Sequence, residues 1–404
     1  MPPKRVIPLV AAGRNRQADA GGIRLRELPP LSLYVHFPWC VRKCPYCDFN
    51  SHEVRTGIPE ADYVSALIAD LEQSLPKIWG RRVVSTFIGG GTPSLLSPEA
   101  VDRLLVALRA RLPLLPDAEI TLEANPGTVD REHFAGYRGA GINRISIGVQ
   151  SFNPKHLAAL GRIHDQHEAR RAVEAALRHF DNVNIDLMYA LPQQTLEEAR
   201  ADIRQAAAFG TSHLSAYHLT VEPNTRFWHE PPSLPDDDLA AAMQEAVEET
   251  LAYHGYGHYE TSAFARPGWQ CRHNLNYWLF GDYLGIGAGA HGKLSFPDRI
   301  VREARQRHPE AYMEGVAQGA AIQEAREVTA DDLPFEFMMN ALRLLDGFPA
   351  RLFPERTGLP LAVLQPELEQ AQALGLLAVD AERIRPTDQG RRFLNDLLQI
   401  FLKG

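Results

Sequence analysis

The sequence predicts an α/β fold, an open and partial (β/α)6 barrel followed by a small helical, winged-helix-like domain. Between about residues 31 and 260, short apolar runs rich in β-branched residues alternate with stretches that have the 3.6-residue periodicity of helices. Beyond about residue 300 this alternation gives way to helical patterns separated by short apolar strands. Repeated βα units form a parallel sheet whose chemistry gathers at the carboxyl ends of the strands, so motifs directly after strands carry the most weight.

The elements are expected in a regular order along the chain. The six strands are expected at 31–36, 83–88, 119–124, 144–148, 183–188 and 213–219. Helical periodicity is clear at 65–75, and a proline-rich break at 231–236 precedes a strong helix at 238–253. In the second domain, short strands are expected at 376–379 and 383–385.

These patterns divide the 404 residues into three parts: a basic leader (1–30), the barrel with its extension (31–300) and the C-terminal helical domain (301–404). The leader lacks the apolar core of a secretory signal, so we expect a mobile segment, with a docking arm as the alternative. Without an export signal or a long apolar run, the expected location is the cytoplasm.

Composition and charge narrow the classes of function. Hydrophobic residues make up 45% and charged residues 23% of the chain, as in ordinary globular proteins. The formal net charge is -8, and no broad stripe of Lys and Arg is present. We therefore expect no nucleic-acid partner, and RNA modification is disfavoured as an activity.

Three of the four cysteines lie close together directly after the first expected strand. Cys40, Cys44 and Cys47 form a C-x3-C-x2-C spacing on a loop, and only Cys271 lies elsewhere. In a reducing cytoplasm such thiols are ligands rather than disulfides. Three soft thiolates at this spacing can hold one [4Fe–4S] cluster and leave its fourth iron open to a bound molecule.

A zinc site is the alternative for these three cysteines. Zinc prefers four closed ligands, and His36, His52 or the distant Cys271 would have to supply the fourth. The cysteine spacing, the preceding strand and the later motifs fit a cluster better than zinc.

The cysteine segment also carries a resemblance to a known family. The run from Tyr34 through His36 and Phe37 to Cys40, continued by Cys47 and the residues up to 50, resembles the radical S-adenosylmethionine (SAM) group that contains the oxygen-independent coproporphyrinogen III oxidases. Within that group it is most similar to the HemW-type haem chaperones. The resemblance implies a radical SAM barrel and a SAM molecule that chelates the open iron through its amino and carboxylate groups.

The resemblance implies SAM contacts at the ends of several strands. The glycine-rich run 89–93 matches the shelf for the methionine amino group, and the matching positions are Tyr34, Tyr46, Gly90, Gly91, Thr92, Glu123, Gln150, Arg162 and Asp186. In porphyrin-oxidising relatives some of these positions serve a second SAM, and the number of SAM molecules stays open here. Read alone, the glycines fit a tight turn, and the polar residues fit solvated strand and helix ends.

A second glycine-rich segment, 285–292, contains G-x-G-x-x-G. A dinucleotide site requires this motif to open a helix inside a βαβ unit and an acidic residue about 20 positions later, and neither is expected here. We expect instead a glycine-rich lip over the SAM site.

Two positions distinguish a haem chaperone from an oxidase within the resembled group. The oxidases carry another cysteine two residues after the last cluster ligand, where this chain has Phe49. His273 lies in a His-Asn-x-x-Tyr-Trp motif that marks the chaperone branch, and imidazole is a common axial ligand of haem iron. His273 is therefore the candidate haem ligand. A structural histidine and ligation by Cys271 are the alternatives.

The resemblance implies a protein that binds haem and passes it to apo-haemoproteins, including respiratory ones at the membrane, which would bring it to the membrane's inner face. It is also compatible with a homodimer. The alternative function is oxidative decarboxylation of coproporphyrinogen III to protoporphyrinogen IX. The sequence does not decide whether SAM is cleaved, and we assign no catalytic residue.

Overall fold

The computed structural model describes residues 22–55 and 57–402. The first 21 residues of the expected leader lie outside the described part. Two of the remaining leader residues, Leu25 and Ile23, pack against the hydrophobic core of the C-terminal domain. The Leu25 amide also donates to Pro297 O, just before that domain. For Ile23 and Leu25 these contacts favour the alternative of a docking arm over a mobile segment.

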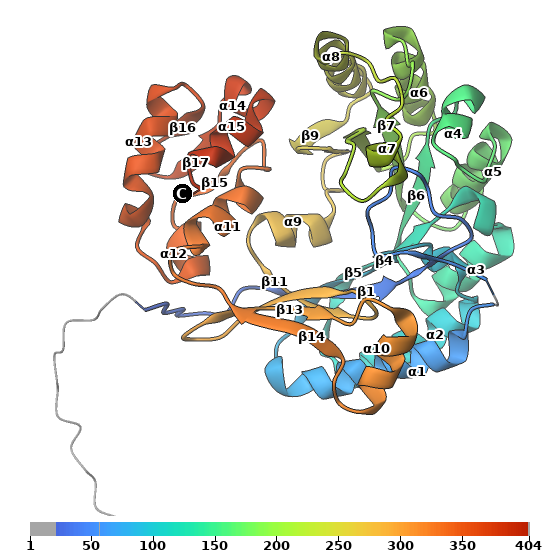
Figure 1. Cartoon of the computed structure of the whole chain (residues 1–404), viewed down its shortest axis with the longest axis horizontal. Coiled ribbons are helices and arrows are strands. Elements are labelled where there is room, and N and C mark those ends of the chain that lie inside the picture. Colours follow the sequence, from blue (N-terminus) through green and yellow to red (C-terminus); the bar gives the residue numbers. More distant parts are fainter. Residues whose placement is uncertain (1–21, 56, 403–404) are drawn as a thin grey trace, which may run out of the picture.

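A curved sheet forms the centre of the molecule (Figure 1). Six of its parallel strands are adjacent in space in the order in which they occur along the chain: β1 (Leu31–Phe37), β4 (Val83–Gly90), β5 (Leu114–Ala124), β6 (Arg144–Gln150), β7 (Asn182–Tyr189) and β8 (His213–His218). Each overlaps one of the six expected strands, which confirms the (β/α)6 prediction. Their side chains are buried on both faces, as is typical of parallel sheets covered by helices.

The sheet continues beyond these six strands on both edges and has 12 strands within the described part of the chain. β11 (Asp282–Ile286) pairs with β1 in parallel, and antiparallel strands follow it: β12 (His291–Ser295), β13 (Ile300–Arg305) and β14 (Ile322–Glu327). At the other edge β8 pairs with β10 (Ala263–Ala265), which pairs with β9 (Gly257–Glu260). A short parallel pair, β2 (Trp39–Cys40) with β3 (His52–Glu53), anchors the cysteine loop.

Helices cover the outer face of the curved sheet (Figure 1). They are α1 (Glu60–Ser74), α2 (Pro98–Arg111), α3 (Arg131–Ala140), α4 (Pro154–Ala159), α5 (Gln166–Leu177), α6 (Leu196–Ala208), α8 (Asp237–Tyr253) and α10 (Pro309–Ala317). The short helix α7 (Arg226–His229) lies instead beside the cysteine loop, where Phe227 N donates to Pro45 O. The 3-10 turns between these elements are η1 (Leu75–Lys77), η2 (Pro93–Leu95) and η3 (Pro126–Thr128). Local sequence defines several starts, because Ser97, Asp165, Thr195 and Asp236 accept hydrogen bonds from free amides of the first turn.

The C-terminal domain has a separate hydrophobic core. It contains α11 (Leu333–Ala341), α12 (Leu352–Thr357), η4 (Leu361–Leu364), α13 (Gln365–Ala373), α14 (Asp388–Arg392), α15 (Leu394–Gln399) and a small antiparallel sheet of β15 (Phe348–Pro349), β17 (Arg383–Pro386) and β16 (Leu377–Val379). The expected boundary at 300 falls at the start of β13, and the large sheet runs on to Glu327. The sequence pattern missed this because β14 is an exposed edge strand without apolar alternation.

The same domain also contacts the far edge of the sheet. The Thr261 amide donates to Arg343 O at 3.0 Å, and Leu345 N donates to Tyr259 O at 3.2 Å. Arg392 of α14 pairs with Glu245 of α8 at 2.7 Å. The domain therefore spans the gap between the two edges of an otherwise open barrel.

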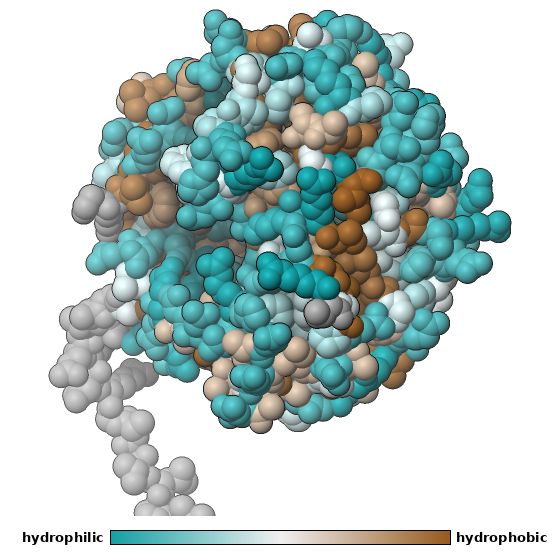
Figure 2. Space-filling view, turned by 45° about the vertical axis from the view of Figure 1, so that its right-hand side comes forward, coloured by the Kyte–Doolittle hydropathy of each residue, from teal (hydrophilic) through white to brown (hydrophobic). Residues whose placement is uncertain are grey.

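One helix lies on the inner side of the sheet. α9 (Arg272–Trp278) contacts β1, β4 and β11, on the side opposite α1 and α2 (Figure 1). It closes one end of the barrel interior. The outer surface is mostly hydrophilic, with separate hydrophobic patches and a hollow on the face shown in Figure 2. No helix of the described chain combines the length and the apolar character that crossing a bilayer requires.

Candidate functional site

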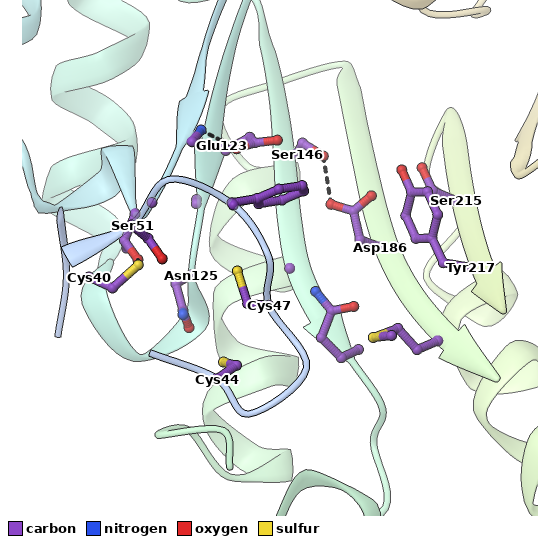
Figure 3. Close-up of a pocket in the computed structure, with 18 of the residues that line it drawn as sticks. Cys40, Cys44, Cys47, Ser51, Glu123, Asn125, Ser146, Asp186, Ser215 and Tyr217 are labelled. Carbon is purple, nitrogen blue, oxygen red and sulfur yellow. Dashed lines mark hydrogen bonds between the residues drawn. The ribbon is translucent and has the colours of Figure 1, made fainter. Parts of the chain in front are cut away.

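A cavity of about 400 Å³ opens at the carboxyl ends of the parallel strands. Its wall contains the cysteine loop and the ends of β4 to β8, as Figure 3 shows. Of the residues predicted to bind the cluster or SAM, all but Tyr34 line it: Cys40, Cys44, Cys47, Tyr46, Gly90, Gly91, Thr92, Glu123, Gln150, Arg162 and Asp186. Segments more than 100 residues apart in sequence therefore meet in one place.

The three cysteines of the loop face this cavity as free, half-buried thiols (Figure 3). The Cys47 amide donates to Cys44 O at 3.2 Å and so bends the loop. Thr92 Oγ1 lies 3.3 Å from Cys40 Sγ and donates to it. Burial raises the pKa of the Cys40 and Cys47 thiols, so an iron–sulfur cluster would have to displace their protons.

The donor set fits a cluster better than one metal ion. Among the described residues, no three His, Cys, Asp or Glu side chains converge on a position for a single ion. His36 and His52 instead hydrogen-bond with Asn50 O and Arg307 O. In a cubane each thiolate binds a different iron, so the thiols only need to surround a common cavity.

The glycine run after β4 is required by close packing. Gly90 has φ of +115°, and a Cβ on it would lie 2.6 Å from the His36 ring. A Cβ on Gly91 would lie 2.5 Å from Trp39 O, in the segment that leads into Cys40. Only glycine lets β4 approach the cysteine loop this closely. The glycines therefore form a tight turn, and the same turn leaves backbone without side chains that could act as a shelf for a ligand.

Two acidic side chains face each other across the cavity. Glu123 Oε2 accepts a hydrogen bond from Gly90 N at 3.1 Å, and burial, followed by the charge of Asp186, raises the pKa of Glu123 to about 8. Asp186 accepts hydrogen bonds from Ser146 Oγ and Asn184 Nδ2, both at 2.8 Å. Burial raises the pKa of Asp186 as well. The pair is suited to a cationic ligand, because a positive charge nearby would lower both pKa values and favour the ionised carboxylates.

Arg144, Ser146 and Asn184 are site residues that the sequence analysis missed. The Arg144 guanidinium is buried, and its charge lowers the pKa of Glu123 and Asp186 against the effect of burial. On β6, Arg144 and Ser146 alternate with apolar residues, which is the period of a strand with one face toward a cavity. Counting back along each strand in steps of two, from Gln150 to Ser146 and Arg144 and from Asp186 to Asn184, would have found this row.

Gln150 and Arg162 are held in defined positions. Gln150 has φ of +68°, which is uncommon for a residue other than glycine and often marks a functional site. Arg162 Nη2 donates to Gly148 O at 2.6 Å, and its Nη1 lies 3.7 Å from Cys44 Sγ. A fixed positive charge therefore stands beside one of the three thiols. The simpler interpretation of Arg162 as a solvated helix-end residue is wrong.

His273 lies inside the barrel and does not line the cavity. Its side chain is 2% exposed, its Nδ1 hydrogen-bonds with Ser85 Oγ at 3.0 Å, and its Nε2 is buried without a partner among the described residues. The ring packs between Phe87 and Tyr277, with centroid distances of 4.9 and 4.8 Å. Burial lowers the pKa of His273 to about 3, so the imidazole is neutral.

Tyr34 and Cys271, the other two candidates, lie on different sides of the interior. The Tyr34 hydroxyl hydrogen-bonds with His36 Nδ1 at 3.0 Å, and its ring lines a second cavity instead of the one with the thiols. Cys271 lines the first cavity, but its Sγ lies 3.4 Å from Glu119 Oε1, and burial raises its pKa to about 12. Cys271 is therefore a neutral, buried thiol.

The glycine-rich segment 285–292 connects β11 to β12, and so it joins two strands rather than a strand and a helix. It packs against the cysteine loop, where Asn50 Nδ2 donates to Ala288 O at 3.0 Å. The segment does not line the cavity with the thiols, so the expectation of a lip over that site is wrong. Gly289 and His291 line the second cavity instead.

Comparison with known proteins adds two family matches. The model described as the radical SAM superfamily matches residues 34–206, which include the three cysteines and every strand end of the cavity except that of β8. The model described as the HemN C-terminal domain matches residues 328–393, which begin where the large sheet ends.

Curated relatives match almost the whole chain. A protein named heme chaperone HemW from Escherichia coli strain K12 is 54% identical over 381 residues, covering 93% of this chain and 99% of that protein. A protein of the same name from Haemophilus influenzae is 48% identical, with the same shares covered. Among solved structures, the coproporphyrinogen III oxidase HemN of Escherichia coli, titled a radical SAM enzyme, matches with a TM-score of 0.79 and 26% identity over 93% of this chain and 90% of that one.

Proposed function

This chain belongs to the HemW family of radical SAM proteins, and on that premise we propose that it binds haem and transfers it to apo-haemoproteins. The observation that carries the proposal is Phe49, which lines the cavity and is 60% exposed. The resembled oxidases have a thiol at this position. An exposed aromatic ring can instead stack on the apolar face of a porphyrin.

In this proposal Cys40, Cys44 and Cys47 hold a [4Fe–4S] cluster with one open iron. SAM bound to that iron would be the acceptor of an electron from the cluster. The backbone at Gly90 and Gly91 can approach the methionine part of SAM closely because neither residue has a side chain. Glu123 would accept the hydrogen bond of the SAM amino group, and a cation there would favour the ionised carboxyl whose pKa burial raises.

His273 is the haem ligand expected from the sequence, and its buried position restricts that role. Its Nε2 has no hydrogen-bond partner and is chemically free to bind iron, but the ring is buried between Phe87 and Tyr277. Ligation by His273 would require α9 to move away from β4. Without that movement the role of His273 is to hold the rings of Phe87 and Tyr277 in place by packing against them.

A second candidate function is oxidation of coproporphyrinogen III. The similarity to the coproporphyrinogen III oxidase HemN over most of both chains favours it. Against it stands Phe49, because chemistry that depends on a thiol at that position is not available to this chain. Haem transfer is therefore the better supported function.

The partners follow from the same proposal. We propose that the recipients are apo-haemoproteins, among them respiratory proteins at the membrane, and that the chain works in the cytoplasm or at the inner face of the membrane. A homodimer formed in the presence of the cluster is part of the proposal. Size-exclusion chromatography with and without reconstituted cluster would test it.

The decisive experiment compares the two activities on one preparation. The full chain is purified without oxygen and reconstituted with iron and sulfide, and haem binding, haem transfer to an apo-haemoprotein and coproporphyrinogen III turnover are measured in parallel. We expect haem binding and transfer, and no protoporphyrinogen. The Phe49→Cys variant is the matched test of the oxidase alternative, because it restores the missing thiol.

Robust turnover of coproporphyrinogen III by the native protein would overturn the chaperone proposal. Absence of haem binding under every cluster and SAM condition would also overturn it.

A further inference from the structure

A second cavity of about 660 Å³ opens beside the first, between the cysteine loop and the β11–β12 connection. Its volume lies within the range of about 300 to 1,000 Å³ that is typical of cavities for small molecules and cofactors. The two cavities share Asp48, Phe49, Phe87, Gly90 and Glu123 as wall residues. A ligand in the second cavity would therefore be a direct neighbour of one in the first.

Aromatic rings form much of the wall of the second cavity. Tyr34 and Phe87 stack with a centroid distance of 6.3 Å, and Tyr277 and Tyr283 meet edge to face at 4.4 Å. Phe49 stands at the junction with the first cavity, and its ring is largely exposed. Aromatic rings at several points of one cavity suit a large, flat, apolar ligand such as a macrocycle.

Two histidines line this cavity, and only one has free ring nitrogens. His36 donates from Nε2 to Asn50 O at 2.8 Å, and its Nδ1 then accepts from the Tyr34 hydroxyl at 3.0 Å. The side chain of His291, at the start of β12, is exposed and has no hydrogen-bond partner among the described residues. Partial desolvation by the cavity wall and the charges of Arg302 and Arg307 lower the pKa of His291, which favours the neutral imidazole that binds metals.

An exposed cation also lines the cavity. The Arg307 guanidinium has no ion-pair partner among the described residues, although its carbonyl accepts from Asn50 and His52. The neighbouring Arg305 is already committed to Asp70 and Glu303. Arg307 is thus free to bind a carboxylate, whereas Glu324, whose charge acts on His291, would repel one.

We infer that the second cavity is the haem-binding site and that His291 supplies an axial nitrogen to the haem iron. The inference rests on the proposed haem-carrying function and deepens it. Phe49, Tyr277 and Tyr283 contact the macrocycle, and Arg307 binds a propionate. His273 acts as a positioning residue, because it packs against Phe87 and Tyr277 from the interior.

The test titrates haem into the full-length, cluster-reconstituted protein and into the His291→Ala and His273→Ala variants. For His291→Ala we expect a shifted Soret band and an affinity weaker by about tenfold or more, as for loss of a metal ligand. Added free imidazole should restore the native band in this variant. His273→Ala should keep the native band position and lose affinity only moderately.

Further variants test whether a change in haem binding is specific to the second cavity. His254→Ala removes a histidine that lines neither cavity and should leave the haem spectrum unchanged. Arg307→Glu should weaken haem binding and keep the native band position, because it changes the propionate contact and not the iron ligand. Iron content and thermal midpoint verify that each variant keeps its cluster and fold.

The outcomes distinguish this inference from the function on which it rests. The inference would be overturned if His291→Ala kept the native haem spectrum and affinity while His273→Ala lost the spectral signature of the imidazole ligand. That result would place the haem at α9 and leave the proposed haem-carrying function intact. Failure of the native protein to bind haem at all would remove the proposed function first. If both His291→Ala and Arg307→Glu bound haem as the native chain does, the second cavity would be excluded as the site.

Discussion

The guanidinium of Arg162 lies against the thiol of Cys44, with Nη1 at 3.7 Å from Sγ. A second hydrogen bond, from Nη2 to Gly148 O at 2.6 Å, holds it there. The side chain therefore places a fixed positive charge beside one of the proposed cluster ligands. Charge and hydrogen bonds near the sulfurs help to set the reduction potential of an iron–sulfur cluster.

Replacing Arg162 with glutamine should lower the reduction potential of the cluster. Reduction adds a negative charge, and the variant lacks the cation that stabilises it. We expect a shift of tens of millivolts, since a tenfold change in a one-electron equilibrium corresponds to about 59 mV. A redox titration followed by electron paramagnetic resonance measures it. Arg171→Gln, an exposed arginine of α5, is the control, and an equal shift there would contradict the assignment.

Replacing Cys40, Cys44 or Cys47 with alanine should remove the cluster, because three thiolates are the smallest set that holds a cubane here. Iron and sulfide analysis after reconstitution measures the loss. Cys271→Ala is the matched control, because its buried, neutral thiol should leave the iron content unchanged. About four irons retained by the Cys44 variant would show that this ligand is wrongly assigned.

Replacing Glu123 with glutamine should weaken SAM binding while the cluster stays intact. A hydrogen bond to a charged group contributes about 1.5–3 kcal/mol, so we expect roughly a 10- to 100-fold weaker affinity. Calorimetry on the reconstituted protein measures it, with Glu99→Gln on α2 as the control. Unchanged affinity would remove Glu123 from the SAM site.

The raised pKa of Glu123, about 8, also predicts a pH effect on the stability of the SAM-free protein. Between about pH 4.5 and 8 the folded state keeps a proton on Glu123 that the unfolded state loses, so the contribution of Glu123 to stability falls as the pH rises. Glu123→Gln should therefore raise the thermal midpoint at pH 8 relative to native, with a much smaller gain at pH 5. An equal difference at both values would contradict the raised pKa.

Replacing Arg305 with alanine should strongly destabilise the fold. Its guanidinium is fully buried between Asp70 and Glu303, where it joins α1 to β13. Removing one partner of a buried ion pair leaves an uncompensated charge and costs about 3–5 kcal/mol. Denaturant unfolding measures this. Arg299→Ala, which removes a partly exposed ion pair with Asp298, should cost less than about 1 kcal/mol.

The strands of the barrel and the thiol set could be predicted because both depend on residues close together in the sequence. Apolar runs of strand length and the spacing of Cys40, Cys44 and Cys47 are local properties. The strands that flank the six βα units escaped prediction: β9 to β14 are short or lack apolar alternation, and their pairing with distant segments defines them. β14, for example, is exposed along most of its length and is held by its register with β13.

By itself, the sequence determined the order of the βα units, the thiol loop and the polar residues at the strand ends. Tertiary structure alone decided which of these side chains share a cavity. Ser146 meets Asn184 because β6 and β7 pair in that register, and the packing of α9 against β4 buries His273. His291 faces a cavity because β12 pairs beside β11. The physical reason is that local sequence sets periodicity and turns, whereas register and packing depend on contacts between segments far apart in the chain.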